Sequence, residues 1–209
     1  RMRGVPVACV GQGIGPLGTF MGQAISQWAF SQAGFIAMRD PESHAWLNPK
    51  TQQHALLMSD LVWAWEPPVL TQEPLAAVAV SLRPWPGLDQ PQVMQWLVQN
   101  IQAIPHVETQ GVHLIACQPH QDVAVLQALE SQLALQGIDC RWFTGWDSVA
   151  GIAQSKSLFG MRYHALLVAA HLERPQLAIA YNPKVQQLAH ALNIQAVTFQ
   201  HILAPAYTT

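Results

Sequence analysis

Short apolar runs alternate along the chain with longer stretches in which apolar residues recur at helical spacing, a pattern typical of α/β proteins. In the first third of the chain we expect strands over residues 5–10, 34–38 and 55–58. A helix is expected over 21–33. A shorter helix is expected to begin at Pro41, because proline suits the first turn of a helix.

A proline-containing break at residues 67–75 separates this part from a more regular one, in which strands and helices alternate strictly. The expected order is strand 76–82, helix 90–104, strand 112–117, helix 122–136, strand 140–143, helix 148–154, a strand–helix pair over 158–172, strand 176–181, helix 185–192 and strand 196–199. This order predicts a doubly wound parallel sheet. We therefore predict two α/β lobes, over residues 1–66 and 76–209, joined by a linker at 67–75.

The composition of the chain argues against several classes of function. Only 11% of the 209 residues are charged and the net charge is -2, so no overall field favours nucleic acid or an anionic membrane. No apolar run is long enough to span a bilayer, and the N-terminal residues do not resemble a signal peptide. No group of metal-ligating residues has suitable spacing, and we expect the three cysteines to be buried free thiols in a reducing cytoplasm.

Cationic side chains cluster where two neighbouring parallel strands are expected to end. Arg162 and His164 follow the strand at 158–160, and Lys184 follows the next strand. Open α/β sheets bind ligands at this carboxyl edge, so these residues predict an anion site, with His164 suited to acid chemistry near neutral pH. Arg83, after the first strand of the second lobe, suits bidentate binding of carboxylate or phosphate. A solvated role for each of these residues stays open at this point.

A glycine-rich turn supports a competing interpretation. The pattern Gly13-x-Gly15-x-x-Gly18 follows a predicted strand, and Asp40 ends the next strand, as in enzymes that bind nicotinamide dinucleotides. Pro16 weakens this NAD(P)-dependent oxidoreductase hypothesis, because it removes a backbone N–H from the loop that would bind the pyrophosphate. A plain strand-to-helix turn with positive φ is the alternative.

Five motifs occur together in one order, at residues 11–16, 39–43, 81–83, 160–165 and 180–185. Together they resemble the polysaccharide pyruvyl transferase family, particularly its CsaB type, over residues 5–199. The most specific part is Gly-Met-Arg-x-His-Ala followed by Tyr-x-Pro-Lys-Val.

The resemblance implies two Rossmann-like lobes arranged as in GT-B glycosyltransferases. It implies that pyruvate moves from phosphoenolpyruvate onto two sugar hydroxyls to form a cyclic ketal, without a cofactor. Arg83, Arg162 and Lys184 are then the expected clamps on the donor anions. His164 is the expected proton donor to the donor's methylene carbon, with simple anion binding as its alternative role.

By analogy with the family, Gln12, Arg39 and Ser43 are expected to line the cleft from the first lobe. Family members normally begin with a further strand and a Gly-Asp-Glu motif, so we expect the first lobe to be truncated. An inactive, sugar-binding remnant is therefore a third hypothesis.

The expected partners are phosphoenolpyruvate and a sugar or lipid-linked glycan acceptor. The expected location is the cytoplasm, with peripheral contact at the inner face of the membrane left open, as is the oligomeric state.

Overall fold

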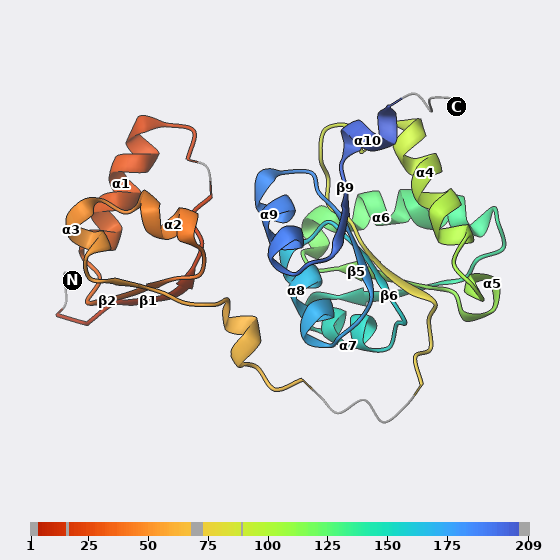
Figure 1. Ribbon diagram of the computed structural model, residues 1–209. Helices are drawn as coiled ribbons and strands as arrows, with labels where there is room; N and C mark the ends of the chain where they lie inside the picture. The colour runs from red at the N-terminus through yellow and green to blue at the C-terminus, as the bar shows by residue number, and fades with distance from the viewer. Residues whose placement is uncertain (1–3, 16, 68–72, 89, 205–209) are drawn as a thin grey trace. The chain divides into compact units, whose positions relative to one another are not determined.

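The computed structural model describes residues 4–15, 17–67, 73–88 and 90–204, and divides the chain into two compact units, Arg1–Glu66 and Pro67–Thr209 (Figure 1). Each unit contains one sheet. A linker over residues 67–75 stays a prediction, since residues 68–72 lie outside the described part of the chain.

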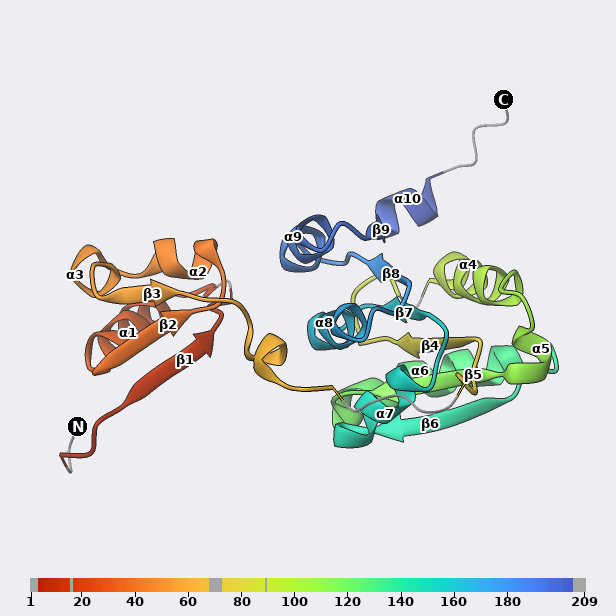
Figure 2. The same ribbon diagram turned by 60° about the horizontal axis from the view of Figure 1, so that its bottom comes forward.

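The first unit is built on three parallel strands in the order β1-β2-β3 (Figure 2). Its elements are β1 (Ala8–Gln12), α1 (Phe20–Ser31), β2 (Phe35–Met38), α2 (Pro41–Trp46), α3 (Pro49–Gln52), β3 (Ala55–Leu57) and the 3-10 helix η1 (Leu61–Ala64). A small core forms around Ile36, Met38 and Leu47. The predicted strand 5–10 begins too early, because pairing with β2 starts at Ala8 and continues to Gln12.

The second unit contains a six-stranded parallel sheet in the order β6-β5-β4-β7-β8-β9. Its elements are β4 (Val78–Ser81), α4 (Pro91–Gln102), α5 (Val107–Gln110), β5 (Val112–Ala116), α6 (Pro119–Ala134), β6 (Cys140–Thr144), η2 (Gly145–Asp147), α7 (Ser148–Ala153), β7 (Leu158–Gly160), α8 (Tyr163–His171), β8 (Gln176–Ile179), α9 (Pro183–Ala191), β9 (Gln195–Val197) and α10 (Phe199–Leu203). In chain order, β4, β5 and β6 lie successively closer to one edge of the sheet, and β7, β8 and β9 lie successively closer to the other edge. This is the Rossmann strand order, and its topological switch point lies between β4 and β7.

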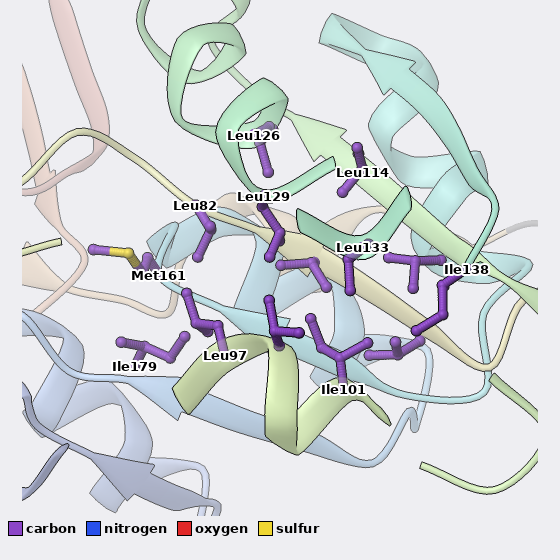
Figure 3. Packing of buried hydrophobic residues seen from close by; sticks show 14 of the residues in the cluster. Leu82, Leu97, Ile101, Leu114, Leu126, Leu129, Leu133, Ile138, Met161 and Ile179 are labelled. Atoms are coloured by element: carbon purple, nitrogen blue, oxygen red, sulfur yellow. The ribbon is translucent and has the colours of Figure 1, made fainter. Parts of the chain in front are cut away.

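Helices cover both faces of this sheet, with α4 and α6 on one side and α7 and α8 on the other (Figure 1). Leu97 and Ile101 of α4 interdigitate with Leu129 and Leu133 of α6 above the strands (Figure 3). All four side chains are fully buried, so the packing of α4 and α6 on the sheet is a large source of stability.

Two predicted boundaries in the second unit are wrong for local reasons. The helix expected at 122–136 begins at Pro119, where proline occupies the first turn. The strand expected at 196–199 ends at Val197, because Thr198 caps a new helix by accepting a hydrogen bond from His201 N.

A buried histidine connects β5 to α7. His113 is 4% exposed, and its Nδ1 lies 2.9 Å from Gly151 O and 3.1 Å from Ser155 Oγ. Burial lowers the pKa of His113 below its ordinary value of 6.5, so the folded chain binds fewer protons here than the unfolded chain. The free energy of unfolding is therefore expected to fall as the pH drops from 6.5 toward the lower pKa of the folded state.

Thermal unfolding at pH 8 and pH 5 checks this prediction. The wild-type chain should lose more stability on acidification than His113→Gln, whereas His120→Gln, at an exposed position, should behave as wild type. Equal acid sensitivity of the wild type and His113→Gln would contradict it.

Candidate functional site

The carboxyl ends of three adjacent strands, β4, β7 and β8, meet around the switch point of the second unit. Ser81 of β4 pairs with Gly160 of β7, and Gly160 pairs with Ala178 of β8, so these strands end level with one another. Ligands of open α/β sheets bind at such a point. Arg83 and Arg162, the cations predicted from the sequence, follow the two strands that flank it.

Arg162 occupies the N-cap position of α8 and is held by a carboxylate from another helix. Its Nε lies 3.1 Å from both Asp122 carboxylate oxygens, and its Nη2 donates to Asp122 Oδ1 and, at 3.1 Å, to Gln121 Oε1. Asp122 is fully buried and Arg162 is 8% exposed. The guanidinium is therefore fixed in orientation by a desolvated ion pair.

Asp122 also organises the start of its own helix. Its Oδ2 accepts a hydrogen bond of 2.9 Å from Gln118 N, in the turn between β5 and α6. One carboxylate thus joins the β5–α6 turn to the β7–α8 turn. Asp122 is not among the site residues predicted from the sequence. The available signal was a proline three residues before an acidic residue in the first helical turn.

Arg83 is held by aromatic side chains from two loops. Its Nη1 donates to the Tyr181 hydroxyl at 3.0 Å, and its guanidinium carbon lies 5.1 Å from the Tyr181 ring centroid and 5.9 Å from that of Trp85. Trp85 meets Tyr181 edge to face, with 4.7 Å between the ring centroids. Arg83 Nε is buried without a hydrogen-bond partner in the described structure. An anionic ligand would satisfy this donor.

His164 and Lys184 lie in the first turns of two consecutive helices. His164 is the second residue of α8 and is exposed, with its ring 5.5 Å from the Tyr163 ring centroid. Lys184 is half-buried near the start of α9, where Asn182 Oδ1 caps Val185 N at 2.9 Å. Both side chains therefore lie near the positive ends of helix dipoles, which favour anions. Arg83, Arg162, His164 and Lys184, the site residues predicted in the second lobe, all follow the ends of adjoining strands.

The Cys117 thiol lies beyond the end of β5, and its Sγ is 3.8 Å from Ser81 Oγ. Burial is the main cause of a raised pKa for this thiol. Cys117 is therefore protonated at neutral pH and is unsuited to be a nucleophile.

In the first unit, Arg39 and Ser43 support the glycine turn. Arg39 Nη1 pairs with Asp60 Oδ2 at 2.9 Å, and a Cβ on Gly13 would clash with the Arg39 guanidinium. Ser43 is 1% exposed, and its hydroxyl accepts a hydrogen bond of 2.7 Å from Ile14 N. A side chain at position 13 would therefore displace the Arg39 guanidinium from its present place.

Gln12 is exposed at the end of β1. Substrate contacts by Gln12, Arg39 and Ser43 stay predictions. The structure places these three residues in one unit, and Arg83, Arg162, His164 and Lys184 in the other.

The features that suggested a dinucleotide site have other roles or cannot be assessed. Asp40 Oδ1 accepts a hydrogen bond of 2.6 Å from Ser43 N and caps α2, so its carboxylate is engaged locally. Pro16 lies outside the described residues.

The described residues contain neither a candidate metal site nor a helix that could span a membrane. No group of three or more histidine, cysteine, aspartate or glutamate side chains there is arranged to hold a metal ion. Within the same ranges, no helix has the length and apolar character needed to cross a membrane.

Comparison with known proteins gives one family and several similar folds. The sequence profile of the polysaccharide pyruvyl transferase family matches residues 1–183. No curated protein matches the chain.

Among solved structures, UDP-GlcNAc 2-epimerase from Methanocaldococcus jannaschii has a TM-score of 0.64 at 9% identity, covering 95% of this chain and 61% of that one. HepE from Anabaena, solved with UDP and glucose, has a TM-score of 0.57 at 11% identity, with coverages of 92% and 58%. These similarities confirm the predicted α/β fold with parallel sheets of GT-B type. The chain spans about three fifths of the length of these two structures.

Proposed function

Because the chain belongs to the polysaccharide pyruvyl transferase family, we propose that it transfers pyruvate from phosphoenolpyruvate onto two hydroxyls of a cell-surface polysaccharide sugar. The observation that carries this proposal is the pair of fixed arginines, Arg83 and Arg162, on the two strands that flank the switch point. Phosphoenolpyruvate has a phosphate and a carboxylate on a three-carbon frame, so it requires several fixed cations close together. The family assignment leaves no reason to propose a nicotinamide-dependent activity.

In the proposed site, Arg83, Arg162 and Lys184 hold the two anionic groups of the donor. Arg83 offers its buried Nε, and Tyr181 and Trp85 keep its guanidinium in place. Arg162 is oriented by Asp122 before the donor binds. Such preorganised donors cost little further ordering when charge develops in the reaction.

The proposed chemistry begins with a proton transfer from His164 to the methylene carbon, which becomes the methyl group. The adjacent carbon then has oxocarbenium character, and the oxygen of one sugar hydroxyl forms a bond to it and loses its proton. The bond from that carbon to the phosphate oxygen breaks, and phosphate leaves with the electron pair. The second hydroxyl then closes the ketal. Of the two hydroxyl protons released, one restores His164 and the other is carried by phosphate or solvent.

Phosphate release from phosphoenolpyruvate tests this function. Release by the 209-residue chain should require an acceptor glycan and should stop when the acceptor is omitted. Absence of release in this chain but not in a longer one would favour the inactive-remnant hypothesis. Absence in both would contradict the proposed function.

Lys184→Ala should weaken use of the donor, because a charged hydrogen bond contributes about 1.5–3 kcal/mol. We expect kcat/KM for phosphoenolpyruvate to fall by about ten- to a hundredfold. Lys156→Ala is the matched control, since Lys156 is exposed and precedes β7 at the opposite edge of the same sheet. An unchanged kcat/KM in Lys184→Ala would place Lys184 outside the site.

A further inference from the structure

A groove runs along the outer side of α4 and α6 in the second unit. The two helices bury their inner faces in the core, where Leu97 and Leu129 meet (Figure 3). On the outer side lie two hollows of about 500 and 470 Å³, and Met94 lines both of them. With a rise of ~1.5 Å per residue, the twelve residues of α4 extend over ~18 Å, room for several linked sugar rings.

The groove starts beside the candidate donor site. Its first hollow is lined by Trp85 and by the prolines on either side of it. The Trp85 ring centroid is 5.9 Å from the Arg83 guanidinium carbon, and Trp85 as a residue is 37% exposed. A ligand chain in this hollow would therefore lie next to the proposed donor-binding cations.

The lining of the groove suits a neutral carbohydrate. Among the residues that the structure describes, neither hollow has a charged lining residue. The first is lined by the aromatic side chain of Trp85, and the second is lined by the glutamines Gln95, Gln99, Gln102, Gln132 and Gln136. Gln102 Nε2 donates to Gln136 Oε1 at 2.9 Å, which joins the two sides.

Sugar rings combine apolar faces with hydroxyls that both donate and accept hydrogen bonds. An aromatic ring followed by amide side chains provides both kinds of partner. The described lining residues offer no counter-charge to an anionic or cationic polymer, and a purely apolar chain would leave the covered amides without hydrogen-bond partners.

From these observations we infer that the α4–α6 groove binds the neutral part of the glycan chain that carries the acceptor sugar. The inference rests on the proposed function, because it assigns to this chain a glycan acceptor. It adds the class of ligand, an uncharged oligosaccharide several rings long, and a path for it away from the donor site.

Affinity electrophoresis of the full 209-residue chain tests the inference. The gels contain a neutral polysaccharide (dextran, a galactan or a mannan) or, for comparison, dextran sulfate. We expect at least one neutral polymer to retard the chain more than dextran sulfate does. In Trp85→Ala, and in the double variant Gln99→Ala/Gln132→Ala, the apparent affinity should fall by about tenfold.

The matched control is the double variant Gln92→Ala/Gln127→Ala, which removes two exposed amides of the same helices that do not line the groove. It should bind as the wild type does. No retardation by any neutral polymer, or equal retardation of all variants, would overturn the inference. Binding needs neither donor nor turnover, so a failure of the proposed transfer reaction would be seen separately.

Discussion

His164→Ala is expected to lower turnover of phosphoenolpyruvate almost to zero while leaving donor binding largely in place. His164 is exposed in the first turn of α8, two residues after Arg162, so its loss leaves the arginine and its ion pair intact. A positioned general acid contributes about 10²- to 10⁴-fold to a rate. We therefore expect kcat to fall by at least a hundredfold, with little change in the dissociation constant of phosphoenolpyruvate.

Acceptor-dependent phosphate release and calorimetric titration of the donor measure these two quantities. His190→Ala is the control, because His190 is also exposed and lies in the last turn of α9, at the opposite end of that helix from Lys184. A near-normal kcat in His164→Ala would exclude the role of proton donor. A loss confined to donor affinity would instead assign His164 to anion binding.

Asp122→Asn is expected to affect both stability and donor use. The substitution preserves shape but leaves Arg162 buried without its counter-charge. Breaking one partner of a buried ion pair typically costs about 3–5 kcal/mol in the free energy of unfolding. We also expect kcat/KM for phosphoenolpyruvate to fall by about a hundredfold or more in the folded fraction, because the guanidinium is no longer held in place. Asp147→Asn, at an exposed position, should change neither quantity.

Chemical rescue separates the positioning of Arg162 from a purely structural effect of Asp122. Added guanidinium should restore part of the activity of Arg162→Ala, since Asp122 remains to orient the cation. It should restore none in the double variant Arg162→Ala/Asp122→Asn. Equal rescue of both variants would mean that Asp122 does not position the guanidinium.

The second unit could be predicted from its sequence to a large extent because its strands are buried on both faces. Residues 78–81 and 112–116 are continuous apolar runs apart from Ser81 and His113, and such runs indicate central parallel strands. When parallel strands alternate with helices, the residues that follow the strands all lie at the same edge of the sheet. The cations that follow the strands therefore lie at that edge too. Arg83 and Arg162 could therefore be assigned to that edge without coordinates.

Other features depend on contacts between distant residues or on weak local signals. Asp122 and Arg162 are 40 positions apart, and only the contact between the start of α6 and the start of α8 at the carboxyl edge of the sheet shows that they form an ion pair. For Gly13 the sequence allows both a phosphate-binding turn and a plain strand-to-helix turn, because its contact with Arg39 cannot be inferred from the sequence. The short helix α3 had a signal that was overlooked, since Asn48-Pro49 repeats the Asp40-Pro41 start of α2.

Nuclear magnetic resonance of the product formed in D₂O is the most direct test of pyruvyl transfer from phosphoenolpyruvate. The chain is incubated with phosphoenolpyruvate and a panel of unpyruvylated cell-surface glycan fragments. We expect a cyclic ketal on one acceptor, with a methyl group that carries one deuterium from the solvent, and one phosphate released per ketal. A product that retains the methylene double bond, or an unmodified acceptor with phosphate release intact, would contradict it.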